Sequence, residues 1–181
     1  MIFIDGSNFY HGMKETFGKD AGIDFTKLIE KLVMWKFRPQ DSYELKRTYY
    51  YNAPLKKEEN EARYKDQQRF FDRLNHIPLF EIKLGRLEKR PDNTKVEKGV
   101  DIQIATDMIY FAFKDLYDIA ILVSGDGDFT PAVARVKETG KQIINAFFPE
   151  GKSYHLLKEC DYFLPLDESF LQDSLLKKRK K

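Results

Sequence analysis

Two aspartates, Asp126 and Asp128, alternate with glycines directly after the apolar run 119–123. This run is short and rich in β-branched residues, which is typical of a strand buried on both faces. A third aspartate, Asp5, follows the apolar run 1–4 in the same way. Loops that leave the carboxyl ends of strands are where open α/β sheets bind their ligands. We therefore expect these carboxylates to lie at a functional edge of the sheet.

Asp101 stands at the expected start of a helix, and Asn8 lies three residues beyond Asp5. Because parallel strands end at one edge of a sheet, we expect the aspartates to face one cleft. Crowded carboxylates repel each other, and a hard divalent cation such as Mg²⁺ or Mn²⁺ relieves that repulsion. Such an ion activates water and holds a phosphate for in-line attack. These residues therefore predict metal-dependent hydrolysis of a phosphodiester bond.

Each aspartate also has a simpler explanation. Asp-Gly after a strand is common in turns, and capping and the helix dipole favour Asp at a helix start. Four such residues at three converging ends are harder to explain by turns alone. Asp107 lies six residues after Asp101 and off its helix face, so we expect it to be structural or to support the site only indirectly.

The remaining segments supply the elements that would position these residues. Apolar alternation and β-favouring composition predict strands, and apolar residues at helical spacing predict helices. We expect strands at 1–4, 45–51, 78–84, 119–123 and 142–148, with 162–165 as a candidate edge strand. We expect the main helices at 24–38, 56–75, 98–112, 131–138, 153–159 and 167–176, and a loop or hairpin at 85–97. The alternation predicts an α/β fold with a mostly parallel central sheet of about five strands and helices on both faces.

Capping signals define several expected helix starts. Ser7 or Asn8 is the expected cap of a short helix after the first strand, and Asp24 caps the next helix. Thr130 and Pro131 have the residue types of an N-cap and a first helical position.

Length and charge narrow the class of protein. The 181 residues suit one domain, which we expect at 1–176, followed by a basic tail at 177–181. The tail supplies five of the positive charges, so the formal net charge of +2 conceals a mildly acidic body. Cys160 is the single cysteine, which excludes a disulfide framework and favours a reducing, cytoplasmic setting. No segment has the length and apolarity of a signal peptide or a membrane span.

The stretch from 83 to 98 is locally positive, with six basic and three acidic residues. Lys98, Arg86, Lys89 and Arg90 within it are candidates for contacting the phosphates of a nucleic acid. Tyr49, Tyr50 and Tyr51 have the ring faces to stack on bases, although alternate ones are expected in the core. A solvated surface loop explains each basic residue equally well when it is considered alone.

Three motifs together resemble one known family. The segments Ile4-Asp-Gly-Ser-Asn8, Lys98-Gly-Val-Asp101 and Ser124-Gly-Asp-Gly-Asp-Phe129 are similar to the signature motifs of the NYN domain family. They are closest to its bacterial LabA-like (DUF88) branch within the PIN-like nuclease superfamily. The similarity covers residues 1–150, with the motifs in the family's order.

The resemblance implies a PIN-like Rossmannoid fold, metal-dependent cleavage of RNA with Mg²⁺ or Mn²⁺, and a homodimer by analogy. By motif, the metal-binding acids would be Asp5, Asp101, Asp126 and Asp128, with Asp128 acting through water. Asn8 would support the catalytic site by hydrogen bonding. The implied partner is RNA, and no membrane is implied.

Rival functions fit the motifs less well. A haloacid-dehalogenase-type phosphatase needs a second Asp two residues after the first, where this chain has Ser7. A topoisomerase-primase-type domain needs Glu in place of Asp5. Ser124 lacks the G-x-S-x-G context of a hydrolase nucleophile, and Cys160 is expected in the core. A non-catalytic RNA-binding or regulatory module is the alternative that the resemblance leaves open.

Overall fold

The computed structural model describes residues 1–35, 43–58, 60–89 and 95–176, and the side chains in these ranges other than those at 88–89 and 95–97. Six parallel strands form a central sheet in the order β3-β2-β1-β6-β7-β8. Strands β4 and β5 form a separate antiparallel hairpin. The strands are β1 (Ile2–Asp5), β2 (Thr48–Asn52), β3 (Phe80–Leu84), β4 (Arg86–Lys89), β5 (Lys95–Lys98), β6 (Ile119–Val123), β7 (Gln142–Phe147) and β8 (Tyr162–Pro165).

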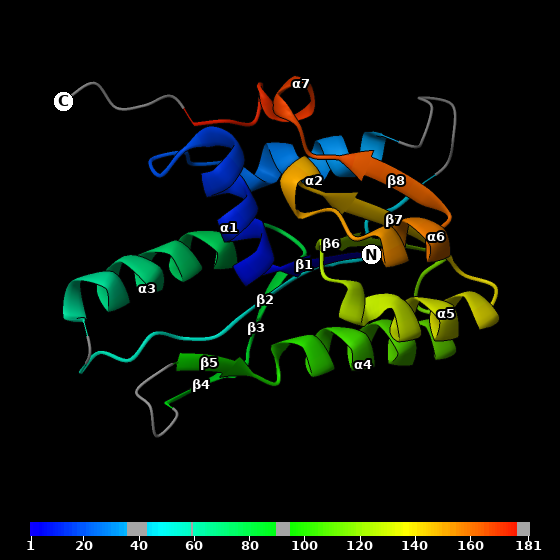
Figure 1. Cartoon of the computed structure of the whole chain (residues 1–181), viewed down its shortest axis with the longest axis horizontal. Helices are drawn as coiled ribbons and strands as arrows, with labels where there is room; N and C mark the ends of the chain where they lie inside the picture. Colours follow the sequence, from blue (N-terminus) through cyan, green and yellow to red (C-terminus); the bar gives the residue numbers. More distant parts are fainter. Residues whose placement is uncertain (36–42, 59, 90–94, 177–181) are drawn as a thin grey trace.

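Helices cover both faces of the sheet, with α2 and α7 on one side and α4 and α5 on the other (Figure 1). Helices α1 and α3 pack on the same side as α2, and α6 packs on the side of α4. The helices are α1 (Gly6–Phe17), α2 (Phe25–Met34), α3 (Glu61–Asn75), α4 (Val100–Phe113), α5 (Thr130–Glu138), α6 (Tyr154–Glu159) and α7 (Glu168–Leu171). None of the helices in the described ranges is long and apolar enough to cross a bilayer.

The predicted α/β class with a mostly parallel sheet is confirmed. The sheet has six strands rather than about five, because the candidate edge segment 162–165 pairs with β7 as β8. The segment 85–97 forms the β4–β5 hairpin, whose tip lies outside the described residues. Helix α3 begins at Glu61 instead of 56, where the Asn60 side chain accepts a hydrogen bond from the Arg63 N–H.

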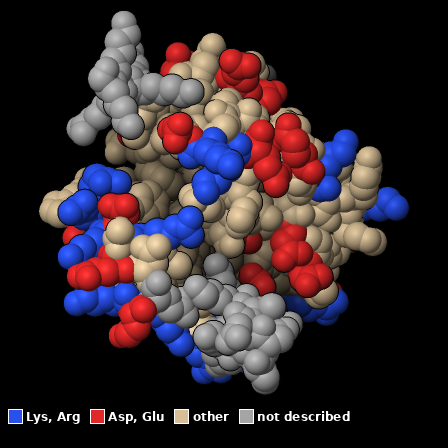
Figure 2. Space-filling model, turned by 60° about the vertical axis from the view of Figure 1, so that its left-hand side comes forward, with Lys and Arg blue, Asp and Glu red and all other residues tan. Residues whose placement is uncertain are grey.

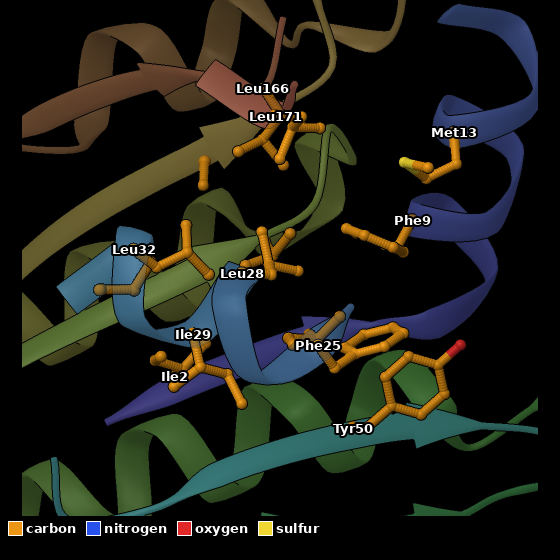
Figure 3. Close-up of a cluster of buried hydrophobic side chains, with 14 of the residues drawn as sticks. Ile2, Phe9, Met13, Phe25, Leu28, Ile29, Leu32, Tyr50, Leu166 and Leu171 are labelled. Atoms are coloured by element: carbon orange, nitrogen blue, oxygen red, sulfur yellow. The ribbon is translucent and has the colours of Figure 1, made fainter. Parts of the chain in front are cut away.

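Alternate residues of the central strands fill two separate cores. Ile2 and Ile4 of β1 point toward α1 and α2, and Phe3 points toward α4. Figure 3 shows the first core, in which Phe25 and Leu28 of α2 lie over the strands. Because β1 and β6 are buried on both faces, their apolar runs are continuous, as the sequence pattern indicated.

Two of the three predicted helix caps are wrong. Asp24 caps α2 as expected, accepting hydrogen bonds from two backbone N–H groups. Helix α1, however, begins at Gly6 with no intervening loop, so its cap is Asp5 rather than Ser7 or Asn8. Thr130 lies inside α5, because a 3₁₀ turn at Gly127–Phe129 precedes that helix.

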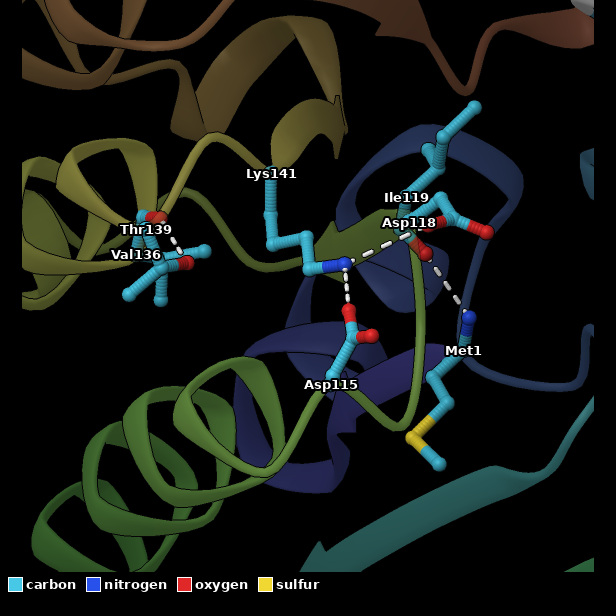
Figure 4. A network of polar contacts seen from close by, with 7 residues as sticks. All are labelled: Met1, Asp115, Asp118, Ile119, Val136, Thr139 and Lys141. Carbon is cyan, nitrogen blue, oxygen red and sulfur yellow. Dashed lines mark hydrogen bonds and ion pairs between the residues drawn. The ribbon is translucent and has the colours of Figure 1, made fainter.

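A polar network closes the amino edge of the sheet (Figure 4). The Lys141 ammonium forms ion pairs with Asp115 and with Asp118, the latter at 3.2 Å. The amine of Met1 donates to the Ile119 carbonyl at 2.8 Å. The aspartates at this edge therefore have a cation beside them, which distinguishes them from the aspartates at the opposite, carboxyl edge.

Two isoleucines of α4 test the assigned orientation of this helix. Ile104 is 0% exposed and Ile102 is 73% exposed. Ile104→Ala should lower the free energy of unfolding by about 2–5 kcal/mol, because it leaves a cavity against the sheet. Ile102→Ala should change it by no more than about 0.5 kcal/mol. Urea denaturation of both variants measures the difference, and equal losses would contradict the orientation.

Candidate metal and phosphate site

The order of the strands reverses between β1 and β6. The chain moves outward from β1 through β2 to β3, and then returns to add β6, β7 and β8 on the other side of β1. Loops after β1 and β6 therefore diverge to opposite faces and leave a crevice at the carboxyl edge, where open α/β sheets bind ligands. Asp5 ends β1 and Ser124 follows β6, so both lie at this crevice.

Asp5 is buried and is held by two hydrogen bonds from different elements. Its Oδ1 atom accepts from the Asn8 N–H at 3.0 Å, which caps α1. Its Oδ2 atom accepts from the Ser124 hydroxyl at 3.0 Å. The carboxylate thus joins β1, α1 and the loop after β6 at one point.

Asn8 and Asp126 extend this network through the loop after β6. The Asn8 Oδ1 atom accepts from the Gly125 N–H at 3.0 Å. The Asp126 N–H donates to the Ser124 hydroxyl at 3.1 Å, and an Asp126 carboxylate oxygen accepts from the Asp128 N–H at 2.9 Å. The sequence motifs around Asp5 and Asp126 therefore form one hydrogen-bonded unit in the structure.

Glycines in both motifs allow the close packing of this unit. A Cβ atom on Gly6 would lie 2.6 Å from the Tyr51 carbonyl oxygen of the neighbouring strand. A Cβ atom on Gly125 would lie 1.8 Å from the Gly151 carbonyl oxygen. Real Cβ atoms do not approach backbone this closely, so larger residues at either position would displace the acids.

The carboxylates of the crevice interact electrostatically. Burial is the main cause that raises the pKa of Asp5 to about 6, with additional contributions from Asp101 and Asp126. The pKa of Asp101, in the first turn of α4, is raised by partial burial and then by Asp126 and Asp128. The four predicted aspartates are therefore close enough to influence each other's ionisation.

Direct ligation of a metal ion requires the carboxylates to lie closer together than electrostatic influence on their pKa values does. Within the described ranges, no three His, Cys, Asp or Glu side chains lie close enough together to hold an ion directly. The donor set nevertheless suits a hard divalent cation, since it consists of carboxylate oxygens that repel each other. Mg²⁺ retains several waters, so a carboxylate beyond direct contact still acts through a water molecule. The residues present fit such a cation chemically.

The predicted substrate-binding residues are only partly described. Arg86 and Lys98 are exposed and lie opposite each other in the β4–β5 hairpin, directly before α4. The backbone of Lys89 lies in β4, but its side chain and the whole of Arg90 are outside the description. Lys83 donates to Asp107 at 2.8 Å, which makes it a structural cation rather than a phosphate contact.

The tyrosines of β2 do not offer bases a stacking surface. Tyr49, Tyr50 and Tyr51 are all buried, which meets the expectation that at least alternate ones lie in the core. The Tyr51 hydroxyl donates to Asp107 at 2.9 Å. Asp107 is therefore held by Tyr51 and Lys83, which accords with its predicted structural role.

Sequence reasoning missed Asn145 as a residue that supports the site. Its side chain is fully buried in β7 and donates to the carbonyls of Leu122 and Ser124 at 3.3 and 2.8 Å. It thereby fixes the end of β6 from which the acidic loop leaves. Asn145 is the one polar side chain inside the apolar run 143–147, a signal that could have identified it.

Comparison with known proteins assigns the chain to a family. The family model described as the NYN domain matches residues 1–167. The chain belongs to the NYN domain family. This membership places it among proteins with a PIN-like nuclease fold.

Two relatives of this NYN protein extend the comparison. A protein of unknown function from Vibrio parahaemolyticus has a crystal structure that aligns with a TM-score of 0.72 and 26% identity, over 97% of this chain and 94% of that one. An uncharacterized protein of Methanocaldococcus jannaschii is 35% identical over 89 residues. That match spans 48% of this chain and 37% of the archaeal protein.

The raised pKa of Asp5 predicts how stability depends on pH. The native state holds this proton more tightly than the unfolded chain, in which the pKa of Asp is about 3.9. The stabilisation is complete below about pH 4 and is lost as the pH rises through about 6. Above that range the ionised carboxylate lowers the free energy of unfolding by roughly 3 kcal/mol, at 1.36 kcal/mol per pKa unit.

In buffer containing EDTA, Asp5→Asn should therefore gain stability relative to the wild-type protein as the pH rises from 4 to 7. Urea denaturation at several pH values measures this gain. Asp72→Asn, which alters an exposed acid of α3, is the control and should follow the wild-type curve. A difference between Asp5→Asn and the wild type that does not vary with pH would contradict the assigned burial.

Proposed function

We propose that this NYN protein is a metal-dependent ribonuclease of the LabA-like (DUF88) branch, which hydrolyses RNA phosphodiester bonds with Mg²⁺ or Mn²⁺. The observation that carries the proposal is the position of Asp5. It is a buried carboxylate at the reversal of strand order, with its pKa raised toward neutrality and two further acids facing it. Such an arrangement is costly unless a cation compensates it, and perturbed acids of this kind gather at functional sites.

The acids have different roles in this proposal. Asp5 and Asp126 would hold the ion, since they follow the adjacent central strands β1 and β6. Asp101 approaches from the first turn of α4, and Asp128 acts through a water molecule because it is exposed. Asn8 does not touch the ion in this scheme. It positions the acidic loop through its hydrogen bond with Gly125.

A bound ion would supply the Lewis acid that polarises the phosphate and acidifies the attacking water. The chain's own side chains orient that centre and bind RNA. Lys98 and Arg86 lie on the hairpin that leads directly into α4 and Asp101, so phosphates held there lie near the acids. Lys89 and Arg90 continue this basic segment in the sequence and belong to the same proposed contact.

One observation favours a second candidate, a non-catalytic RNA-binding or regulatory module. Within the described residues, the aspartates influence each other's ionisation without approaching to ligation distance. In such a module, the acids would serve the fold, and Lys98 and Arg86 would still bind RNA. The two candidates differ in whether RNA is cleaved.

Incubation of single-stranded and structured RNA with the protein separates the candidates. With Mn²⁺ or Mg²⁺ we expect cleavage that EDTA abolishes. Asp126→Asn should reduce the rate by at least about 100-fold, because it removes one carboxylate charge from the site. Gel analysis of end-labelled RNA measures the rate.

Asp72→Asn is the matched control, since it removes one exposed acid of α3 that does not face the crevice. Its cleavage rate should equal that of the wild type. RNA binding without cleavage in any metal would support the regulatory module and reject the ribonuclease. Cleavage that persists in Asp126→Asn would reject the assignment of the acids.

The proposal includes three broader expectations. We take residues 1–176 as one domain that acts in the cytoplasm, where the buried thiol of Cys160 stays reduced. Burial raises the pKa of that thiol to about 12, so it is not a nucleophile. We also propose a homodimer, on the family resemblance, which sedimentation velocity would distinguish from a monomer.

A further inference from the structure

A groove of about 830 Å³ opens beside the acidic crevice, between α1, the start of α2 and α3. It begins at Gly6 and Ser7, the residues that directly follow Asp5, and reaches Leu87 of the β4–β5 hairpin. It therefore connects the proposed substrate-binding hairpin with the start of α1, directly after Asp5. Figure 2 shows the side of the molecule that lies to the left in Figure 1; it is hollowed, with Lys and Arg side chains beside the hollow.

The floor of the groove is aromatic. Phe70 of α3 is half-buried, and its ring lies 5.7 Å from the rings of both Tyr50 and Phe25. Figure 3 shows Phe25 and Tyr50 side by side at this end of the core. At the rim, the exposed rings of Tyr10 and His11 lie 5.5 Å apart. Since Tyr50 and Phe25 are buried, the surfaces left to stack on nucleobases are the half-buried ring of Phe70 and the rings at the rim, and such stacking is independent of sequence.

Two arginines line the α3 wall of the groove. Arg63 and Arg73 are exposed, and neither forms an ion pair with another residue in the described part of the chain. They are ten residues apart, which is about 15 Å along a helix. Asp66 on the same wall is paired with Arg69 at 3.4 Å, so it leaves the two arginines as the available charges.

We infer that this groove binds single-stranded RNA next to the cleavage site, with an unpaired base against Phe70 and neighbouring phosphates on Arg63 and Arg73. This inference rests on the proposed function, because it takes the crevice at Asp5 as the place of cleavage. The volume lies within the range of about 300–1,000 Å³ of ligand pockets. Duplex RNA does not fit this binding mode, because its bases are stacked and paired.

Charge complementarity selects RNA over an apolar peptide. An apolar helix would cover the aromatic floor, but it would leave both arginines at the walls without a partner. RNA has phosphates that pair with the arginines of the walls and bases that stack on the aromatic floor, so it contacts both. The groove thus adds two cations of α3 to those of the hairpin, which it reaches at Leu87.

Fluorescence anisotropy in buffer containing EDTA tests whether Arg63 and Arg73 bind RNA phosphates. The probe is a short labelled oligouridine that contains one 2-aminopurine, titrated at several salt concentrations. Arg63→Ala and Arg73→Ala should each weaken binding and reduce the salt slope by about 0.7, the contribution of one phosphate in single strands. Lys65→Ala, on the same helix but paired with Glu61 outside the groove lining, should bind like the wild type.

The fluorescence of the 2-aminopurine tests whether a base stacks on Phe70 at the floor of the groove. Its fluorescence should be quenched on binding to the wild type and less so to Phe70→Leu, which removes the ring but retains an apolar side chain. Unchanged affinity and slope in both arginine variants would overturn the inference, as would bound RNA without quenching. Arginine-dependent binding in a protein that cleaves no RNA would reject the proposed function and support the groove.

Discussion

The burial of one carboxylate organises this structure. Asp5 ends the central strand at the reversal of the sheet, where water cannot solvate it fully. Its two oxygens are satisfied by the Asn8 N–H and the Ser124 hydroxyl, and these two contacts join α1 to the loop after β6. Because burial and, to a smaller extent, the negative charges of Asp101 and Asp126 raise the pKa of Asp5, the hydrogen bonds alone do not restore it to its usual range. A divalent cation is the natural compensation.

Much of the surrounding packing follows from this arrangement. Gly6 and Gly125 permit the close approach that brings the two motifs together, and Asn145 fixes the end of β6 from the neighbouring strand. The chemistry proposed for the acids therefore depends on backbone spacing that larger side chains would disturb.

The sequence predicted the class of fold, and it indicated the acids as candidates, because both depend on local patterns. Continuous apolar runs mark the buried strands, and Asp126 stands at the end of one of them. The caps of α1 and α5 were wrong because several residues near each start have suitable side chains, and tertiary hydrogen bonds select among them. The groove was not predicted, since it joins Phe70 and Arg63 to α1 through contacts between distant segments.

The roles of cations also needed the structure. Lys83 lies in a positive stretch of sequence, yet in the fold it forms an ion pair with Asp107. Arg63 and Arg73 lie in a helix of mixed charge that gave no signal, yet they remain available at the groove. A charge in the sequence indicates a binding residue only when its ion pairs in the fold are known.

Titration of the protein with Mn²⁺ by isothermal calorimetry tests the central claim most directly. We predict that the wild type binds Mn²⁺, that binding is abolished or strongly weakened in Asp5→Asn and Asp126→Asn, and that it is retained in Asp72→Asn. Comparison of these variants distinguishes Mn²⁺ binding at the crevice from binding at an exposed acid elsewhere. Failure of the wild type to bind Mn²⁺, or equal binding by Asp5→Asn, would contradict the claim that these aspartates form a cation site.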